Sequence, residues 1–101
     1  MIVYNVTIKV EWAIHDQWLQ WMKQEHMPEL ISTGCFHQSQ LLRLIEVDEE
    51  EGPTYAAQYY AESKALYNQY IEKFSVEKRE KAFQKWGNRF IAFRSVMQVV
   101  D

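Results

Sequence analysis

The stretch "IVYNVTIKV", residues 2–10, decides the fold, because its apolar side chains repeat at every second position. In an extended chain one face would carry Ile2, Tyr4, Val6, Ile8 and Val10, and the other would carry Val3, Asn5, Thr7 and Lys9. This alternation predicts a β-strand with one buried face. The buried face needs a covering layer, and the residues that follow supply one.

Residues 13–25, "AIHDQWLQWMKQE", change to the spacing of an amphipathic helix. At about 100° per residue, one arc would contain Ile14, Trp18, Trp21, Met22 and Glu25. Pro28 has no amide hydrogen for the Gln24 carbonyl, and its ring crowds that carbonyl, so we expect the helix to kink or restart there. Gly34 can end it in a left-handed conformation.

The rest of the chain repeats this alternation of strands and helices. Strands are expected at "LLRLIEV" (41–47) and "TYAAQYYA" (54–61), joined as a hairpin by the turn "DEEEGP" (48–53). Ser63 can cap a second helix, which Ser75 restarts and Gly87-Asn88 ends. Its predicted apolar stripe consists of Leu66, Tyr67, Tyr70, Ile71, Phe74, Val76, Ala82, Phe83 and Trp86. A last strand follows at "RFIAFRSVMQVV" (89–100).

The resulting order, β-α-β-β-α-β, predicts a ferredoxin-like α+β fold over residues 1–101, with an antiparallel sheet and both helices on one face. Depending on register, the uncovered face carries Val3, Ala56, Tyr60, Phe90, Ala92 and Val96 beside Asn5, Thr7, Gln58 and Arg94. Burying such apolar surface is worth about 25 cal/mol per Å². We therefore predict a homodimer in which two sheets meet and enclose a partly polar space.

Composition limits the classes of function. The net charge of −3 gives no basic footprint for nucleic acid. No apolar run approaches the roughly 20 residues of a membrane span, and no signal peptide is expected. The single cysteine, Cys35, excludes an internal disulfide and favours a reducing compartment, so we expect a cytoplasmic protein.

Four segments carry a family resemblance: "MIVYNVTIKV", "WLQWMKQEHMPELISTGCF", "EGPTYAAQYYA" and "KWGNRFIAFRSVMQVV". Their most specific pieces are the H-x-P-E-x-x-x-x-G-x-F pattern that begins at His26 and the W-G-N-R-F sequence that begins at Trp86. Together they resemble a family of small bacterial proteins catalogued as a domain of unknown function, which is similar to the dimeric α+β barrel superfamily. That superfamily holds monooxygenases, haem-degrading enzymes, isomerases and stress-response proteins. The resemblance implies a fold and dimerisation but no reaction.

Glu25 and His26 are the candidate catalytic residues. One interpretation is structural, since carbonyls freed by Pro28 need donors that a histidine can supply. The other places both side chains in the space between the sheets as a general base and its partner. Neither these residues nor His15 and His37 match a recognised metal spacing, so no metal is expected. No cofactor motif is present either.

The candidate ligand-binding residues lie on predicted strands: Asn5, Thr7, Arg43, Gln58, Tyr60 and Arg94. An arginine facing another sheet should be paired or hold an anion. The simpler alternative is a pair with Glu46 or Glu11. Two functions therefore compete. The first is a non-catalytic dimer that binds a small apolar or aromatic ligand or a partner protein. The second is a cofactor-independent monooxygenase- or isomerase-like enzyme.

Overall fold

A four-stranded antiparallel sheet and a layer of helices make up the computed structural model, which describes residues 1–101. The strands are β1 (Ile2–Val10), β2 (Gln38–Arg43), β3 (Thr54–Ala61) and β4 (Phe90–Gln98). The helices are α1 (His15–Trp21), α2 (Met27–Ser32), α3 (Lys64–Lys73) and α4 (Ser75–Trp86). A 3₁₀ turn, Trp12–Ile14, precedes α1, and a π-helical turn, Met22–His26, joins α1 to α2.

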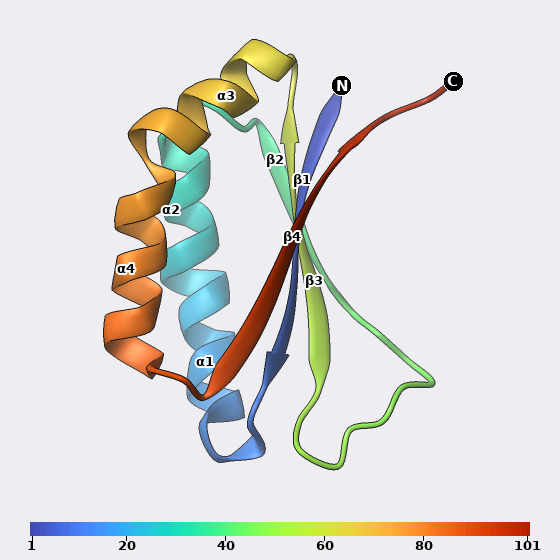
Figure 1. Cartoon of the computed structure of the whole chain (residues 1–101), viewed down its shortest axis with the longest axis vertical. Coiled ribbons are helices and arrows are strands. Elements are labelled where there is room, and N and C mark those ends of the chain that lie inside the picture. Colours follow the sequence, from blue (N-terminus) through green and yellow to red (C-terminus); the bar gives the residue numbers. More distant parts are fainter.

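The strand order is β2-β3-β1-β4, with every neighbouring pair antiparallel. Figure 1 shows the helices on one side of the sheet and no layer on the other. This arrangement confirms the predicted ferredoxin-like α+β fold. None of the helices combines the length and apolar character that crossing a bilayer would require.

The core lies between the sheet and the helices and is rich in aromatic rings. As the alternation in β1 predicts, Tyr4, Val6, Ile8 and Val10 are all buried there. The ring of Tyr4 lies 6.0 Å from that of Phe36, 5.9 Å from that of Tyr59 and 5.6 Å from that of Tyr70. These separations suit offset or tilted aromatic pairs.

Strand β2 begins and ends earlier than predicted, at residues 38–43 instead of 41–47. It ends at Arg43, and residues 44–53 form a loop in which Ile45 is 79% exposed. The loop still pairs once with β3, because Leu44 donates its backbone N–H to the Thr54 carbonyl (2.9 Å), and its far end extends the pairing of β3 with β1. Val10 donates its backbone N–H to the Pro53 carbonyl (3.1 Å), and Trp12 donates to the Glu51 carbonyl (3.2 Å).

The predicted faces of β4 are wrong by one residue. Thr7 lies opposite Phe93 and Asn5 lies opposite Ser95, so Phe93 and Ser95 share the uncovered side, whereas Arg94 points toward the helices. A shift of one residue exchanges the two faces of a strand. The open face, as we call the uncovered side, consists of Val3, Asn5, Thr7, Lys9, Gln38, Gln40, Leu42, Thr54, Ala56, Gln58, Tyr60, Ile91, Phe93, Ser95 and Met97.

The apolar stripe of the second helix also differs from prediction. Ser63 caps α3 by accepting a hydrogen bond from the Leu66 N–H (3.2 Å). The chain then breaks at Phe74 before α4 begins. After this break Val76 and Phe83 are exposed, each at 63%, rather than part of the core.

Candidate functional site

An interior cavity of about 50 Å³ lies between the helices and the sheet. Twelve of its sixteen lining residues are hydrophobic. Its aromatic walls are Tyr4, Trp18, Trp21, Tyr59, Tyr70 and Phe90. The cavity therefore lies inside the protomer, not on the open face where a ligand site was expected.

The π-helical turn Met22–His26 brings His26 into the interior cavity. Met27 donates its backbone N–H to the Met22 carbonyl, one residue further back than in an α-helix. Because this wider turn contains an extra residue, His26 lies inward and Glu25 is exposed. The predicted arc through Glu25 is therefore wrong. The predicted kink or restart takes the form of this π-helical turn in a backbone that stays helical from 15 to 32, and Pro28 lies in the first turn of α2.

His26 is held in a nonpolar setting that keeps its imidazole neutral. Its ring stacks on Trp21, with centroids 4.6 Å apart and an interplanar angle of 23°. The pKa of His26 is lowered to about 4, mainly by burial; Glu29 acts to raise it, and Lys78 and Arg94 act with burial to lower it. His26 and Glu25 therefore form no acid–base pair, because the carboxylate lies outside the cavity that contains the imidazole.

Three permanent cations line the interior cavity, and no carboxylate does. Lys78 forms an ion pair with Glu29, in which the Lys78 Nζ lies 3.5 Å from the Glu29 Oε2. Arg79 and Arg94 take part in no ion pair within the chain. The cavity thus combines an aromatic interior with a cationic rim.

Two buried tyrosines add hydroxyl groups to this cavity. Burial raises the pKa of Tyr59 and of Tyr70, and each is raised further by the neighbouring tyrosines. Both phenols therefore keep their protons and remain potential hydrogen-bond donors. Arg79 and Arg94 act in the opposite direction on the pKa of Tyr70, which shows that both guanidinium groups lie within electrostatic reach of it.

Four of the six predicted ligand-binding residues meet on the open face. Asn5 donates to Thr7 Oγ1 (3.0 Å) and accepts from Gln58 Nε2 (3.3 Å). The Tyr60 hydroxyl donates to Gln58 Oε1 (3.1 Å). Ser95, which the sequence did not suggest, accepts a further bond from Asn5 (3.4 Å). These side chains satisfy one another in a network that is separate from the interior cavity.

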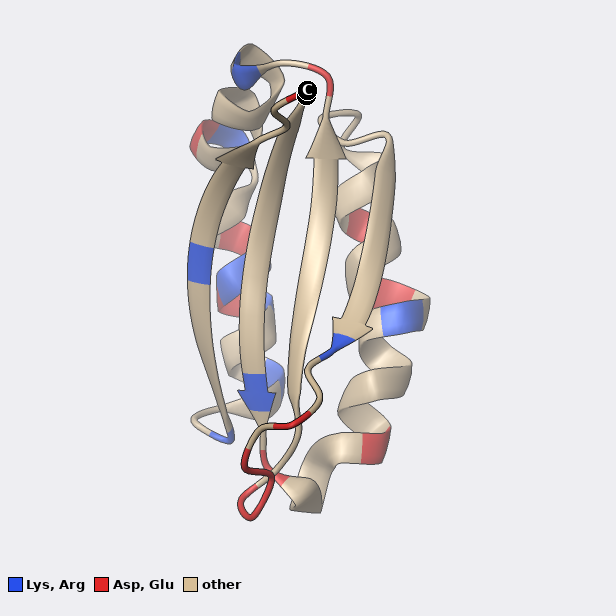
Figure 2. Ribbon diagram, turned by 90° about the vertical axis from the view of Figure 1, so that its right-hand side faces the viewer, with Lys and Arg blue, Asp and Glu red and all other residues tan.

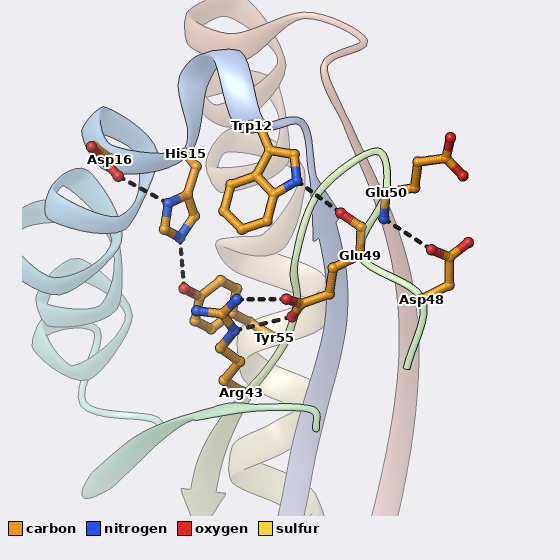
Figure 3. Close-up of polar contacts among 8 residues, drawn as sticks. All are labelled: Trp12, His15, Asp16, Arg43, Asp48, Glu49, Glu50 and Tyr55. Carbon is orange, nitrogen blue, oxygen red and sulfur yellow. Dashed lines mark hydrogen bonds and ion pairs between the residues drawn. The ribbon is translucent and has the colours of Figure 1, made fainter. Parts of the chain in front are cut away.

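Arg43 belongs to neither group, because the loop residue Glu49 holds it (Figure 3). Its Nη2 and Nε lie 2.8 and 3.1 Å from the two carboxylate oxygens of Glu49. The guanidinium also lies 5.9 Å from the ring centroids of both Trp12 and Tyr55. The expected pairing with Glu46 or Glu11 is therefore wrong, and Arg43 fastens the loop 44–53 to the sheet.

A second group of hydrogen-bonded polar side chains lies in the same region and was not predicted from the sequence. The Nε2 of His15 lies 2.7 Å from the Tyr55 hydroxyl, and its Nδ1 lies 3.0 Å from Asp16 Oδ1 (Figure 3). Only the adjacency of His15 and Asp16 could have suggested it. None of the main cavities of the molecule is lined by His15, Asp16 or Tyr55. Nowhere do three His, Cys, Asp or Glu side chains converge as metal ligands would.

Residues 1–100 match the family described as "Domain of unknown function (DUF4286)". Among solved structures, the chain is similar to an ethyl tert-butyl ether d (EthD) family protein from Bacillus halodurans, with a TM-score of 0.67. The likeness covers 99% of this chain and 100% of that one at 11% identity, and it shows the fold alone.

Among curated proteins, the chain is 30% identical over 76 residues to the Ras-related protein RABA6b of Arabidopsis thaliana. This match covers 72% of the chain but only 33% of that protein, so the chain spans about a third of its length. The chain itself has no G-x-x-x-x-G-K-[ST] phosphate loop, because Cys35, Pro53 and Asn88 follow its three glycines.

Proposed function

Since the chain belongs to the family described as a domain of unknown function (DUF4286), we propose a function from its own geometry: a homodimeric module that binds a small ligand in the interior cavity of each protomer. The observation that carries the proposal is the lining of that cavity, which joins aromatic walls to unpaired guanidinium groups and a neutral histidine. Ligand sites are mostly apolar hollows with a few convergent polar groups. At about 50 Å³ the cavity fits only a few non-hydrogen atoms without rearrangement.

Dimerisation is supported by the open face, which Figure 2 views directly. Few charged residues lie on its strands, and acidic residues gather in the loop between β2 and β3. Phe93 is 70% exposed and Ile91 is 59% exposed on this face. Around them, the network from Asn5 to Tyr60 presents amide and hydroxyl groups. A second copy, related by a two-fold axis, would cover the same surface on both partners.

A binding role is better supported than catalysis. A general base works best when its pKa lies near the operating pH, and burial lowers that of His26 to about 4. Glu25 lies outside the cavity and so could not assist it. We place the module in the cytoplasm because its one thiol, Cys35, is unpaired. The enzyme alternative would require a partner for His26 other than Glu25.

Native mass spectrometry of the protein purified from its own host tests both parts of this proposal. We expect the mass of a dimer that carries a small-molecule increment on each protomer. The substitution Ala82→Trp fills the cavity from α4 and should abolish the increment, whereas Ala65→Trp, at an exposed position of α3, should keep it. Circular dichroism establishes that both variants fold. A monomer mass would reject dimerisation, and an increment that survives in the folded Ala82→Trp variant would reject the cavity.

A further inference from the structure

We propose that the ligand is a small monocarboxylate with a short apolar tail, bound with its carboxylate between Arg79 and Arg94 and its tail in the aromatic cavity. This inference rests on the proposed ligand-binding function and specifies the chemical class that the interior cavity selects. It follows from the charges around the cavity, from the character of its interior and from its size.

The charges favour an anion. Lys78, Arg79 and Arg94 line the cavity without a single Asp or Glu among the lining residues. Lys78 is already paired with Glu29, at 3.5 Å, but Arg79 and Arg94 have no carboxylate partner. An approaching anion would therefore meet two free guanidinium groups, each able to bind a carboxylate through two parallel hydrogen bonds.

Arg43 provides a comparison, because it has a carboxylate within reach and forms an ion pair with it. Both oxygens of Glu49 contact it, at 2.8 and 3.1 Å, and the pair stays together at the surface. The contrast with Arg79 and Arg94 is informative because all three arginines border aromatic side chains. Arg79 and Arg94 lack an internal acidic partner, as does Arg89, but only Arg79 and Arg94 line the same cavity, where one ligand could bind both.

Further donors lie beside the guanidinium groups. The hydroxyl of Tyr70 is within electrostatic reach of both arginines, and burial keeps it protonated. The neutral His26 lies within reach of Arg94 and carries one N–H on its ring. A carboxylate has two oxygens and about four acceptor positions, so it can use these donors together with the guanidinium groups. A neutral or cationic head group would leave most of them unpaired.

The interior selects against a second charge. Trp18 and Met22 are almost completely buried, and Ile8 and Phe90 extend the apolar wall. A charged group carried into this interior would lose its hydration without a partner, which is costly. The volume of about 50 Å³ also restricts the tail to a few carbon atoms. These limits favour a monocarboxylate over dicarboxylates, phosphates and long fatty acids.

Titration with butyrate, butyramide and n-butylamine tests the inference, because these probes share a short tail and differ in head-group charge. Binding is followed by the NMR shifts of the indole N–H groups of Trp18 and Trp21, which line the cavity. We expect butyrate to bind at least about tenfold more tightly than either other probe, the ratio that one charged hydrogen bond supplies. The double variant Arg79→Gln/Arg94→Gln should weaken butyrate by about tenfold or more, and Arg89→Gln, an exposed arginine outside the cavity, should not.

The outcomes separate this inference from the proposed function. If butyramide binds as tightly as butyrate, or if the double variant binds butyrate unchanged, the carboxylate assignment is overturned while the cavity remains a ligand site. If no probe binds although protein from the host carries a mass increment, the ligand belongs to another class and this inference fails alone. If no increment is found on the host protein and no probe binds, both proposals fail.

Discussion

His26 should make the stability of this protein depend on pH in a way that one substitution removes. In the native state burial beside Trp21 lowers the pKa of His26 to about 4, from an ordinary value of 6.5 that the unfolded chain regains. Between these values the unfolded chain takes up a proton that the native protein does not. The stability contributed by the neutral imidazole is therefore fully present above about pH 6.5, falls as the pH drops toward 4, and falls no further below that.

The size of this effect follows from the difference between the two pKa values, about two and a half units. At about 1.4 kcal/mol per unit the full loss is about 3 kcal/mol, and most of it, about 2.5 kcal/mol, should have occurred by about pH 4.5. This is a large share of the 5–15 kcal/mol that is typical of a small domain.

Urea unfolding followed by tryptophan fluorescence measures this loss. Native carboxylates also titrate in the same range, so the informative quantity is the difference between variants, not the wild-type curve alone. Between pH 7 and about pH 4.5 the free energy of unfolding of His26→Gln should fall by about 2.5 kcal/mol less than that of the wild type. His37→Gln removes a more exposed histidine near Glu62 and serves as the matched control for the loss of an imidazole outside the cavity. Equal slopes for His26→Gln and the wild type would refute the buried, neutral imidazole.

Two further predictions concern the open face and the loop 44–53. Burying Phe93, which is 70% exposed, should be worth about 1–2 kcal/mol per protomer, so Phe93→Asp should weaken the dimer about 30-fold or more, whereas Phe83→Asp, at 63% exposure on α4, should not. Light scattering over a concentration series measures this, and equal behaviour of the two variants would exclude the open face as the interface. A Cβ at Gly52 would lie 1.7 Å from the Val10 carbonyl oxygen, so Gly52→Ala should lower the free energy of unfolding by about 3 kcal/mol. Gly87→Ala meets no neighbouring atom and should cost about 2 kcal/mol, because its φ of 63° with ψ of −135° is a conformation that favours glycine; a smaller loss for Gly52→Ala than for Gly87→Ala in urea melts would contradict the packing argument.

Local patterns were sufficient to predict the element order and the buried face of β1. The alternation from Ile2 to Val10 and the cap at Ser63 depend only on neighbours in sequence, and the structure contains both. The predictions were wrong where contacts with residues distant in the sequence determine the structure. The register of β4 is set by its pairing with β1, which places Arg94 opposite Val6. Strand β2 ends at Arg43, whose side chain pairs with the loop residue Glu49, and no pattern within residues 41–47 could show that contact.

The cavity itself was hidden because its lining comes from four separate parts of the chain. Tyr70 belongs to the predicted apolar stripe of the second helix and Tyr59 to the predicted strand 54–61, and no sequence pattern relates Arg79 to either of them. Their convergence depends on how α3 and α4 are turned after the break at Phe74. A helical projection that continues one apolar stripe across the restart at Ser75 therefore assigns Phe83 to the core and misses the residues that line the cavity.

The neighbouring residues Glu25 and His26 have different positions because of one local change in backbone hydrogen bonding. Pro28 cannot donate to the Gln24 carbonyl, and the helix accommodates it through the wider turn in which Met27 donates to Met22. That turn moves the carboxylate into solvent and the imidazole into the aromatic cavity, where an ionised group would be costly. The proline therefore does more than divide the helix, because the turn that accommodates it brings a histidine rather than a carboxylate to the cavity.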